Sequence, residues 1–227
     1  MIVSVHQPQY LPWIGYFHKI AHSDVFVFLD NVQYKKREFQ NRNKIRTKEG
    51  WLWLTVPVIT KGRFTQKMKE VLIDNTSNWH KKHWQSIEMN YSKAKYFNEY
   101  KEFFKSLYEK EWDKLIDLNV FIIKYINELL NIKIPVYYES DLNIEGEKTT
   151  RIINICKKLN ADTYLSGIGG KEYLIEEEFI KTGIKLIYQN FKHPVYTQVY
   201  PGFEPFMSIV DLLFNCGKES KNLLYRF

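Results

Sequence analysis

Two short apolar runs near the start of the chain narrow the range of folds that this sequence can adopt. They are IVSV, residues 2–5, and VFVFL, residues 25–29, and both are rich in the β-branched and aromatic side chains typical of buried strands. The connection between them has the length of a crossover, and its Ile14, Phe17 and Ile20 have helical spacing. The pattern predicts a βαβ unit.

The second half of the chain continues this alternation of strands and helices. The sequence predicts strands at residues 134–138, 162–166 and 184–189, and helices at residues 148–160, 172–183 and 205–217. Strands that alternate with helices predict a parallel sheet. We therefore expect an α/β fold with a doubly wound, mostly parallel sheet of the Rossmann or HUP type, in a single domain of residues 1–227.

Two segments interrupt the alternation. Residues 31–75 begin with a polar stretch and then contain WLWLTVPV, residues 51–58, and EVLID, residues 70–74, as short strand candidates. Residues 76–131 repeat apolar side chains at helical spacing. We expect a small β-rich insertion over residues 31–75 and a helical segment of two or three helices over residues 76–131.

Composition and charge exclude several classes of protein. No apolar run has the length of a bilayer span, and the start of the chain lacks the features of a secretory signal, so we expect a cytoplasmic protein without membrane insertion. Cys156 and Cys216 have no metal-ligand spacing, and His80 and His83 have no nearby carboxylate pair, so we expect no metal site and no cofactor. We interpret the net charge of +7 as Lys residues on solvated helix faces, which favours an anionic small molecule over a polynucleotide and predicts no DNA partner.

Four polar motifs directly follow predicted strands. They are HQPQYLP (residues 6–12), DNVQYKKREFQNRNK (30–44), SGIGGK (166–171) and NFKHPVY (190–196). Because the carboxyl ends of parallel strands lie at one edge of the sheet, where α/β proteins bind ligands, we expect the four motifs to form one site.

Three residues at strand ends are candidates for proton transfer. His6 and His193 can each carry a proton near neutral pH, or each can be a hydrogen-bonded histidine that shapes its loop. Asp30 can orient such a histidine or act as a base. We expect His6, Asp30 and His193 to be the catalytic residues.

Glycine and amide side chains are the candidates for substrate binding. The glycines of SGIGGK can bring N–H groups close to an anion, although a plain glycine-rich turn explains them equally well. QNRNK, residues 40–44, suits hydroxyl and phosphate groups, with a solvated loop as the alternative. The predicted substrate-binding residues are Gln7, Gln9, Tyr10, Gln33, Asn41, Arg42, Asn43, Lys44, Ser166, Gly167, Gly169, Gly170 and Lys171.

Five motifs in order also carry a resemblance over nearly the whole chain. HQPQYLPWIGYFHKI, DNVQYKKREFQNRNKI, LTVPV, YLSGIGGKEYL and SIVDLLFNCG resemble the motifs of the WbqC-like protein family. The resemblance implies a transferase of bacterial surface-polysaccharide (O-antigen) biosynthesis that moves an aminoacyl or acyl group, such as glycyl, to the amino group of a nucleotide-linked 4-amino-sugar. A carrier protein, a coenzyme A thioester, a charged tRNA, or a free amino acid with ATP would each fit as the donor.

A fainter likeness connects the first βαβ unit to nucleotidylyltransferases with an HxGH signature. Here Trp13 and Tyr16 stand around Gly15 where that signature has its two histidines. A nucleotidylyltransferase-like enzyme with a degenerate motif and a non-catalytic sugar-nucleotide-binding protein are therefore the alternative functions. The aromatic helices of residues 84–126 can pack against the sheet or against a second copy, which leaves a homo-oligomer open.

Overall fold

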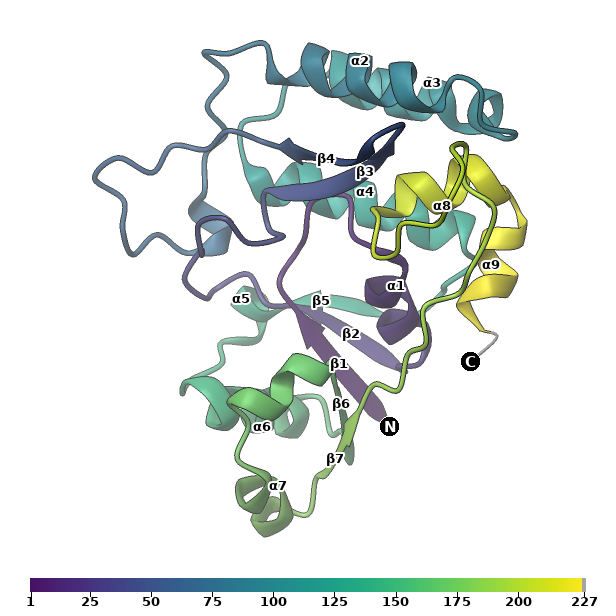
Figure 1. The fold of residues 1–227 in the computed structure, drawn as a ribbon. Coiled ribbons are helices and arrows are strands. Elements are labelled where there is room, and N and C mark those ends of the chain that lie inside the picture. Colours follow the sequence, from purple (N-terminus) through teal and green to yellow (C-terminus); the bar gives the residue numbers. More distant parts are fainter. Residues whose placement is uncertain (226–227) are drawn as a thin grey trace.

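A parallel sheet of five strands forms the centre of the computed structural model, which describes residues 1–225 (Figure 1). The strands are β1 (Ile2–His6), β2 (Val25–Phe28), β5 (Val136–Tyr138), β6 (Thr163–Ser166) and β7 (Lys185–Tyr188). Their order is β5-β2-β1-β6-β7, and every neighbouring pair is parallel. This order confirms the predicted α/β fold.

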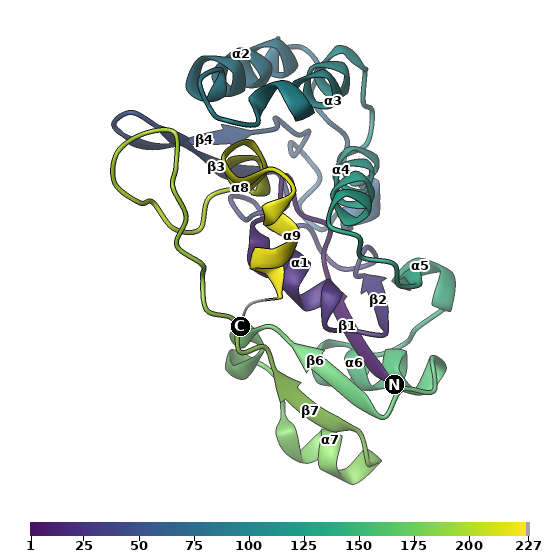
Figure 2. The same cartoon turned by 90° about the vertical axis from the view of Figure 1, so that its right-hand side faces the viewer.

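Helices cover both faces of the sheet. They are α1 (Ile14–Ala21), α2 (Trp79–Tyr91), α3 (Phe97–Glu109), α4 (Leu115–Leu129), α5 (Glu139–Leu142), α6 (Lys148–Lys158), α7 (Glu176–Thr182), α8 (Ile209–Cys216) and α9 (Glu219–Leu224), with the 3-10 helices η1 (Met68–Glu70) and η2 (Ile168–Glu172). Figure 2 shows α1, α8 and α9 close together in the middle of the molecule, with α2 and α3 above them and α6 and α7 below.

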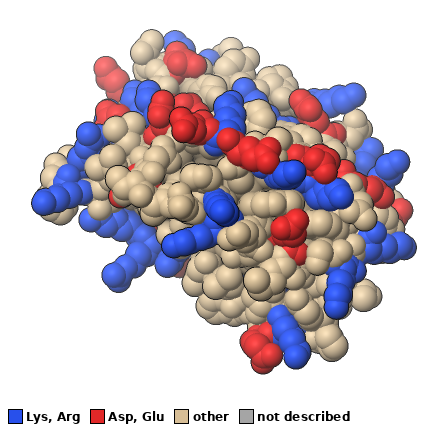
Figure 3. Space-filling model, turned by 90° about the horizontal axis from the view of Figure 1, so that it is seen from above, with Lys and Arg blue, Asp and Glu red and all other residues tan. Residues whose placement is uncertain are grey.

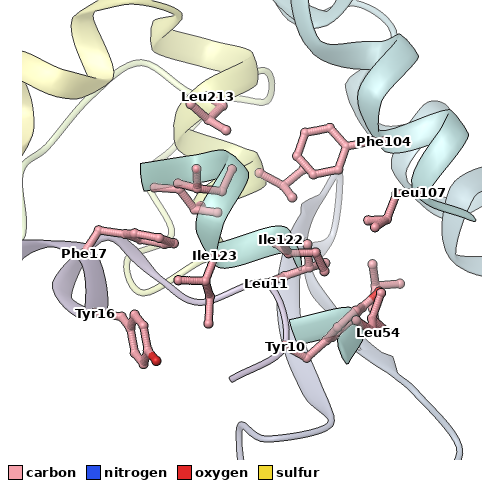
Figure 4. Close-up of a cluster of buried hydrophobic side chains, with 14 of the residues drawn as sticks. Tyr10, Leu11, Tyr16, Phe17, Leu54, Phe104, Leu107, Ile122, Ile123 and Leu213 are labelled. Carbon is pink, nitrogen blue, oxygen red and sulfur yellow. The ribbon is translucent and has the colours of Figure 1, made fainter. Parts of the chain in front are cut away.

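Strand β2 shows how the two faces are filled. Its Phe26 and Phe28 join a large core cluster with side chains of α1, α3, α4 and α8, part of which Figure 4 shows. Its Val25 and Val27 join a smaller cluster with α6 and α7. Because side chains alternate along a strand, a strand that is apolar throughout is buried on both faces, as a doubly wound sheet requires.

The insertion contains a β-hairpin of β3 (Arg42–Thr47) and β4 (Gly50–Thr55). The sequence predicted β4 but not β3, because the charged and amide side chains of QNRNK are unusual in a strand. The predicted strand at residues 70–74 is wrong: Leu72 and Ile73 make only single bridges, to Lys114 and Val58, which belong to no strand. Short helices α5 and α9 were also not predicted.

Two buried amide side chains hold the loop of residues 7–12, which contains two prolines. Asn43 of β3 donates from Nδ2 to two loop carbonyl oxygens, at 2.7 and 3.4 Å. Asn119 of α4 donates from Nδ2 to the carbonyl oxygen of Pro8 at 3.1 Å and to that of Gln40 at 2.8 Å. Since a buried carbonyl group without a donor is costly, these amides fix the loop against the hairpin and the helical segment.

Removal of one amide tests this arrangement. Asn43→Ala should lower the free energy of unfolding by about 2–3 kcal/mol, because it leaves buried carbonyl groups without donors. Asn98→Ala, at an exposed position of α3, is the matched control and should change it by less than about 0.5 kcal/mol. Urea denaturation followed by circular dichroism measures both, and equal values for the two variants would contradict the structural role of Asn43.

Candidate functional site

Strands β1 and β6 separate at their carboxyl ends and open a crevice. Their pairing ends at Ser4 and Leu165, whereas β1 stays paired with β2 up to His6 and β6 stays paired with β7 up to Ser166. The chain also adds β2 and β5 on one side of β1, and β6 and β7 on the other. The crevice is therefore at the switch point of the sheet, where α/β proteins bind ligands.

A cavity of about 430 Å³ occupies this crevice. Its walls come from the end of β1 and the loop after it, the start of α1, residues 35–40 and residues 164–173. The predicted residues among its lining are His6, Gln7, Gln9, Ser166, Gly167, Gly169 and Gly170. The structure thus brings the first and third polar motifs together with residues 35–40 of the second motif, although these segments are far apart in the sequence.

Lys19 of α1 is a buried cation in this cavity. Its Nζ donates to the carbonyl oxygen of Val5 at 3.0 Å and lies 4.0 Å from where a Cβ atom would stand on Gly167. No carboxylate of residues 1–225 forms an ion pair with it, and the residue is only 3% exposed. Burial lowers the pKa of Lys19 from 10.5 to about 7. An anionic ligand would supply the counter-ion that this ammonium group lacks.

His6 stands in the same cavity as a neutral imidazole. Burial, and next the positive charge of Lys19, lower the pKa of His6 well below its usual value. The His6 ring stacks on Tyr16 with a centroid distance of 4.8 Å, and its Nε2 lies 3.5 Å from Nε2 of Gln9. Its Nδ1 and the Oε1 of Gln9 are both buried without a hydrogen-bond partner in the described residues. Two polar atoms are therefore available to a ligand.

The glycine-rich motif SGIGGK packs tightly against the end of β6. A Cβ atom on Gly170 would lie 2.0 Å from Oγ of Ser166, so only glycine fits there without a shift of its neighbours. The Oγ of Ser166 donates to the carbonyl oxygen of Gly167 at 3.0 Å. Lys171 is not in the cavity lining, and its Nζ lies over the ring of Tyr188, 5.1 Å from the centroid.

Trp13, Gly15 and Tyr16 line the cavity where an HxGH motif would place its histidines. The indole ring of Trp13 covers Gly15, on which a Cβ atom would lie 2.2 Å from that ring. The hydroxyl group of Tyr16 donates to the carbonyl oxygen of Gln7 at 3.2 Å. Two uncharged aromatic rings thus replace the imidazoles, and neither ring can bring a positive charge to a triphosphate.

His193 lies outside the cavity lining, and both of its ring nitrogens are bonded to backbone groups. Its Nδ1 donates to the carbonyl oxygen of Pro194 at 2.8 Å, and its Nε2 accepts from the N–H group of Phe206 at 3.1 Å. Burial lowers its pKa, which keeps the ring neutral. These contacts are those of a histidine that shapes its loop, and they leave no ring nitrogen for a substrate.

Asp30 is buried at the end of the β2 segment, away from the cavity lining. Its carboxylate accepts from the backbone N–H of Ser140 at 2.9 Å and from the hydroxyl group of Ser140 at 2.6 Å. Ser140 is in the first turn of α5, so the carboxylate satisfies a free N–H group of a helix start. The predicted orientation of His6 by Asp30 has no contact to support it.

Tyr10 and Gln33, which the sequence predicts as substrate-binding residues, contact other parts of the protein. Tyr10 is fully buried beside Leu54, as Figure 4 shows, and its hydroxyl group lies 2.8 Å from Nδ1 of His83 and 2.5 Å from the hydroxyl group of Tyr108. Gln33 donates to a backbone carbonyl oxygen at 2.9 Å and does not line the cavity. Tyr10 is therefore placed in the core, outside the cavity lining.

Side chains of the motif QNRNK point alternately to the two faces of β3. Asn43 points inward to the loop, and Asn41, just before the strand, donates to the carbonyl oxygen of Val56 at 2.8 Å. Arg42 and Lys44 point to the opposite face, where they lie over tryptophan rings of β4. None of these four residues lines the cavity, so the structure does not bring them to the crevice that contains His6.

Lys19 and Gln189 are cavity residues that the sequence did not predict. Gln189 donates from Nε2 to the carbonyl oxygen of Gly15 at 2.8 Å, which ties the end of β7 to the start of α1. A signal for Lys19 does exist: it is the one Lys, Arg, Asp or Glu in the short helix IGYFHKIA, residues 14–21, whose other side chains are mostly apolar. Every residue from 14 to 20 is buried.

Two observations on residues 1–225 concern membranes and metals. No helix in this stretch of the chain combines the length and the apolar character that a membrane span needs. No three His, Cys, Asp or Glu side chains within it gather as metal ligands, and Cys156 and Cys216 are free thiols.

Fold and site together define an α/β protein with a cationic, glycine-lined crevice at the switch point of a doubly wound sheet. A family model described as the WbqC-like protein family matches residues 7–223, and the chain belongs to this family. Its sequence is 39% identical over 224 residues to the uncharacterized protein Rv1507c of Mycobacterium tuberculosis (strain ATCC 25618 / H37Rv), a match that covers 98% of this chain and 96% of that protein. No solved structure gives a significant match.

Replacement of Lys19 tests the buried charge. Lys19→Met should raise the free energy of unfolding of the ligand-free protein by about 2–4 kcal/mol at pH 6, because an apolar side chain replaces an ammonium group without a counter-ion. Between pH values of about 7 and 10.5 the folded wild type loses this proton while the unfolded chain keeps it, so wild-type stability rises with pH and the difference shrinks.

Urea denaturation at pH 6 and at about pH 10 measures this difference. Lys82→Met, at an exposed position of α2, is the control and should give the same small change at both pH values. A pH-independent effect of Lys19→Met would contradict the lowered pKa of Lys19.

Proposed function

We propose that this protein is a transferase of bacterial surface-polysaccharide biosynthesis. It transfers an aminoacyl or acyl group, such as glycyl, to the amino group of a nucleotide-linked 4-amino-sugar. Membership of the WbqC-like protein family supports the biological setting. The observation that carries the proposal is the unpaired, buried Lys19 beside His6 in the switch-point cavity, because a nucleotide-linked sugar brings both a pyrophosphate and an amine to such a place.

In this proposal Lys19 binds the pyrophosphate. Its ammonium group lies beside Gly167, so the backbone N–H groups of the glycine-rich loop and the charge of Lys19 can bind the same anion. An anion next to Lys19 raises its pKa again, so that the lysine is fully charged when the substrate is bound. The free Oε1 of Gln9 accepts a hydrogen bond from the sugar.

His6 acts as the general base in the same proposal. In the tautomer that carries its proton on Nε2, the neutral imidazole accepts at its free Nδ1 the proton that the sugar amine loses as its nitrogen attacks the acyl carbon. The new bond is the amide C–N bond, and the bond that breaks joins the acyl carbon to the oxygen or sulfur of the donor. His6 then returns the proton to that leaving group. General-base assistance of this kind is worth about 10² to 10⁴ in rate.

Transfer of an adenylyl group is a less favoured use of the same cavity. Trp13 and Tyr16 stand in place of the histidines that stabilise a triphosphate, and the buried cation of the cavity, Lys19, lies beside the glycine-rich loop. ATP consumption with release of pyrophosphate in the absence of any donor would favour this alternative instead.

A direct assay tests the proposal. Purified protein is incubated with a dTDP-linked 4-amino-sugar and a glycyl thioester, and mass spectrometry detects the amide product. His6→Asn should lower turnover by about 10² or more, because the base is lost. Lys19→Met should weaken binding of the nucleotide-sugar by about tenfold or more, because a buried charge-assisted contact is lost.

Lys82→Met and His80→Asn on α2 are the matched controls, since neither residue lines the cavity. Both should behave like the wild type in turnover and in calorimetric titration with the nucleotide-sugar. If His6→Asn and Lys19→Met also behaved like the wild type, the cavity would not be the site of transfer.

A further inference from the structure

The net positive charge of the chain is concentrated in one segment. Residues 31–70 contain eleven Lys and Arg and three Glu, a net charge of +8, whereas the whole chain has a net charge of +7. The other 187 residues together thus have a net charge of −1. This distribution corrects the interpretation of the charge as Lys scattered over helix faces. Figure 3 shows Lys and Arg gathered at the lower left with few acidic neighbours, while both signs mix elsewhere.

None of these eleven cations forms an ion pair within residues 1–225. The ion pairs of these residues involve the amino terminus, Lys105 and Arg151. Lys35, Lys36, Arg37, Lys61 and Arg63 are all exposed. A group of exposed cations without counter-ions favours a polyanionic partner.

The outer face of the β-hairpin interleaves these cations with tryptophan rings. The guanidinium group of Arg42 lies 4.3 Å from the ring centroid of Trp53, and Nζ of Lys44 lies 4.3 Å from that of Trp51. The two indole rings are 5.8 Å apart, and Phe39 lies 5.9 Å from Trp53. Trp51 and Phe39 are 45% and 40% exposed, so part of each of these two rings can contact a partner beside the half-buried Arg42 and Lys44.

This surface is continuous with the cavity. Lys35 and Phe39 belong to the charged segment and also line the cavity beside His6. A partner bound on the hairpin can therefore place its end at the candidate active site. We call the surface formed by Lys35, Phe39, Arg42, Lys44, Trp51 and Trp53 the basic-aromatic surface.

We propose that the basic-aromatic surface binds single-stranded RNA and that the acyl donor is an acyl group esterified to the end of that RNA. Phosphates need cations and unpaired bases need ring faces, and this surface alternates the two. An acidic carrier protein offers carboxylates but no bases to stack, so it would use only half of the surface. The donor assignment rests on the proposed function, whereas RNA binding does not.

The transfer itself needs no further reactant. The ester bond between the acyl carbon and the ribose oxygen breaks, and the amide bond to the sugar nitrogen forms. The proton that the amine loses passes to the ribose oxygen, with His6 as its carrier.

Binding of a fluorescent, unstructured oligoribonucleotide tests the surface by anisotropy over a range of salt concentrations. Trp51→Ala combined with Trp53→Ala should weaken binding about tenfold or more and leave the salt dependence unchanged, because stacking carries no charge. Arg42→Gln combined with Lys44→Gln should weaken binding and also lower the slope of log affinity against log salt by about 1.4.

Lys81→Gln combined with Lys82→Gln, two exposed residues of α2, removes the same charge elsewhere and is the control. All variants must melt like the wild type. Equal affinities of all three double variants for the oligoribonucleotide would overturn the proposal that the basic-aromatic surface binds RNA. Saturable binding of an acidic acyl carrier protein that competes with the RNA and is lost in the tryptophan variant would also overturn it.

A comparison of two donors separates the two proposals. Product from a glycyl-RNA, with a loss in the tryptophan double variant, supports delivery by RNA. If the protein forms product from a glycyl thioester but not from glycyl-RNA, the proposal that RNA carries the acyl donor is overturned. The proposed transferase activity is then supported. No product from either donor overturns the transferase, and with it the donor assignment, while RNA binding is still decided by the anisotropy experiment alone.

Discussion

The structure depends on how the loop of residues 7–12 satisfies its backbone inside the core. The loop follows the central strand and contains two prolines, and its Pro8, Tyr10, Leu11 and Pro12 are buried, so the carbonyl groups of these residues need donors from the protein. The amides of Asn43 and Asn119 supply donors from the hairpin and from α4, and the backbone N–H of Ile209 at the start of α8 supplies another to Pro12. Sheet, hairpin, helical segment and closing helix are therefore joined at one short loop, which also carries the first residues of the cavity.

The cavity exists because β1 and β6 diverge before the pairing of each with its outer neighbour ends. This divergence leaves the carbonyl group of Val5 without a strand partner, and Lys19 fills that role with a charged donor. A neutral donor would satisfy the same carbonyl group at a lower electrostatic cost, so the ammonium group destabilises the ligand-free protein near neutral pH. An electrostatic cost of this kind is typical of a binding site in which the ligand supplies the missing counter-ion.

Much of the fold could be predicted from the sequence, and the site could be predicted only to a limited extent. Apolar runs and turn residues are local signals, and they predicted the parallel sheet and the convergence of His6 with the glycine-rich loop. Asn43 and Tyr10 look like ligand contacts in sequence, but their polar groups serve buried partners that only the tertiary structure supplies. Lys19 was missed because a lysine in a helix is usually solvated. The sequence left open whether His193 carries a proton or shapes its loop. Its partners are backbone groups of Pro194 and Phe206, and backbone hydrogen bonds of this kind leave no signal in the sequence.

The cations that cover the tryptophan rings of the hairpin also affect the free protein. A two-stranded hairpin with indole rings on its outer face resembles the edges through which proteins aggregate. Lys44 lies within 5.4 Å of both ring centroids, and Arg42 covers Trp53 as well. Two copies that approached each other through this face would first bring like charges together. The like charges thus disfavour contact between two copies through this face of the hairpin.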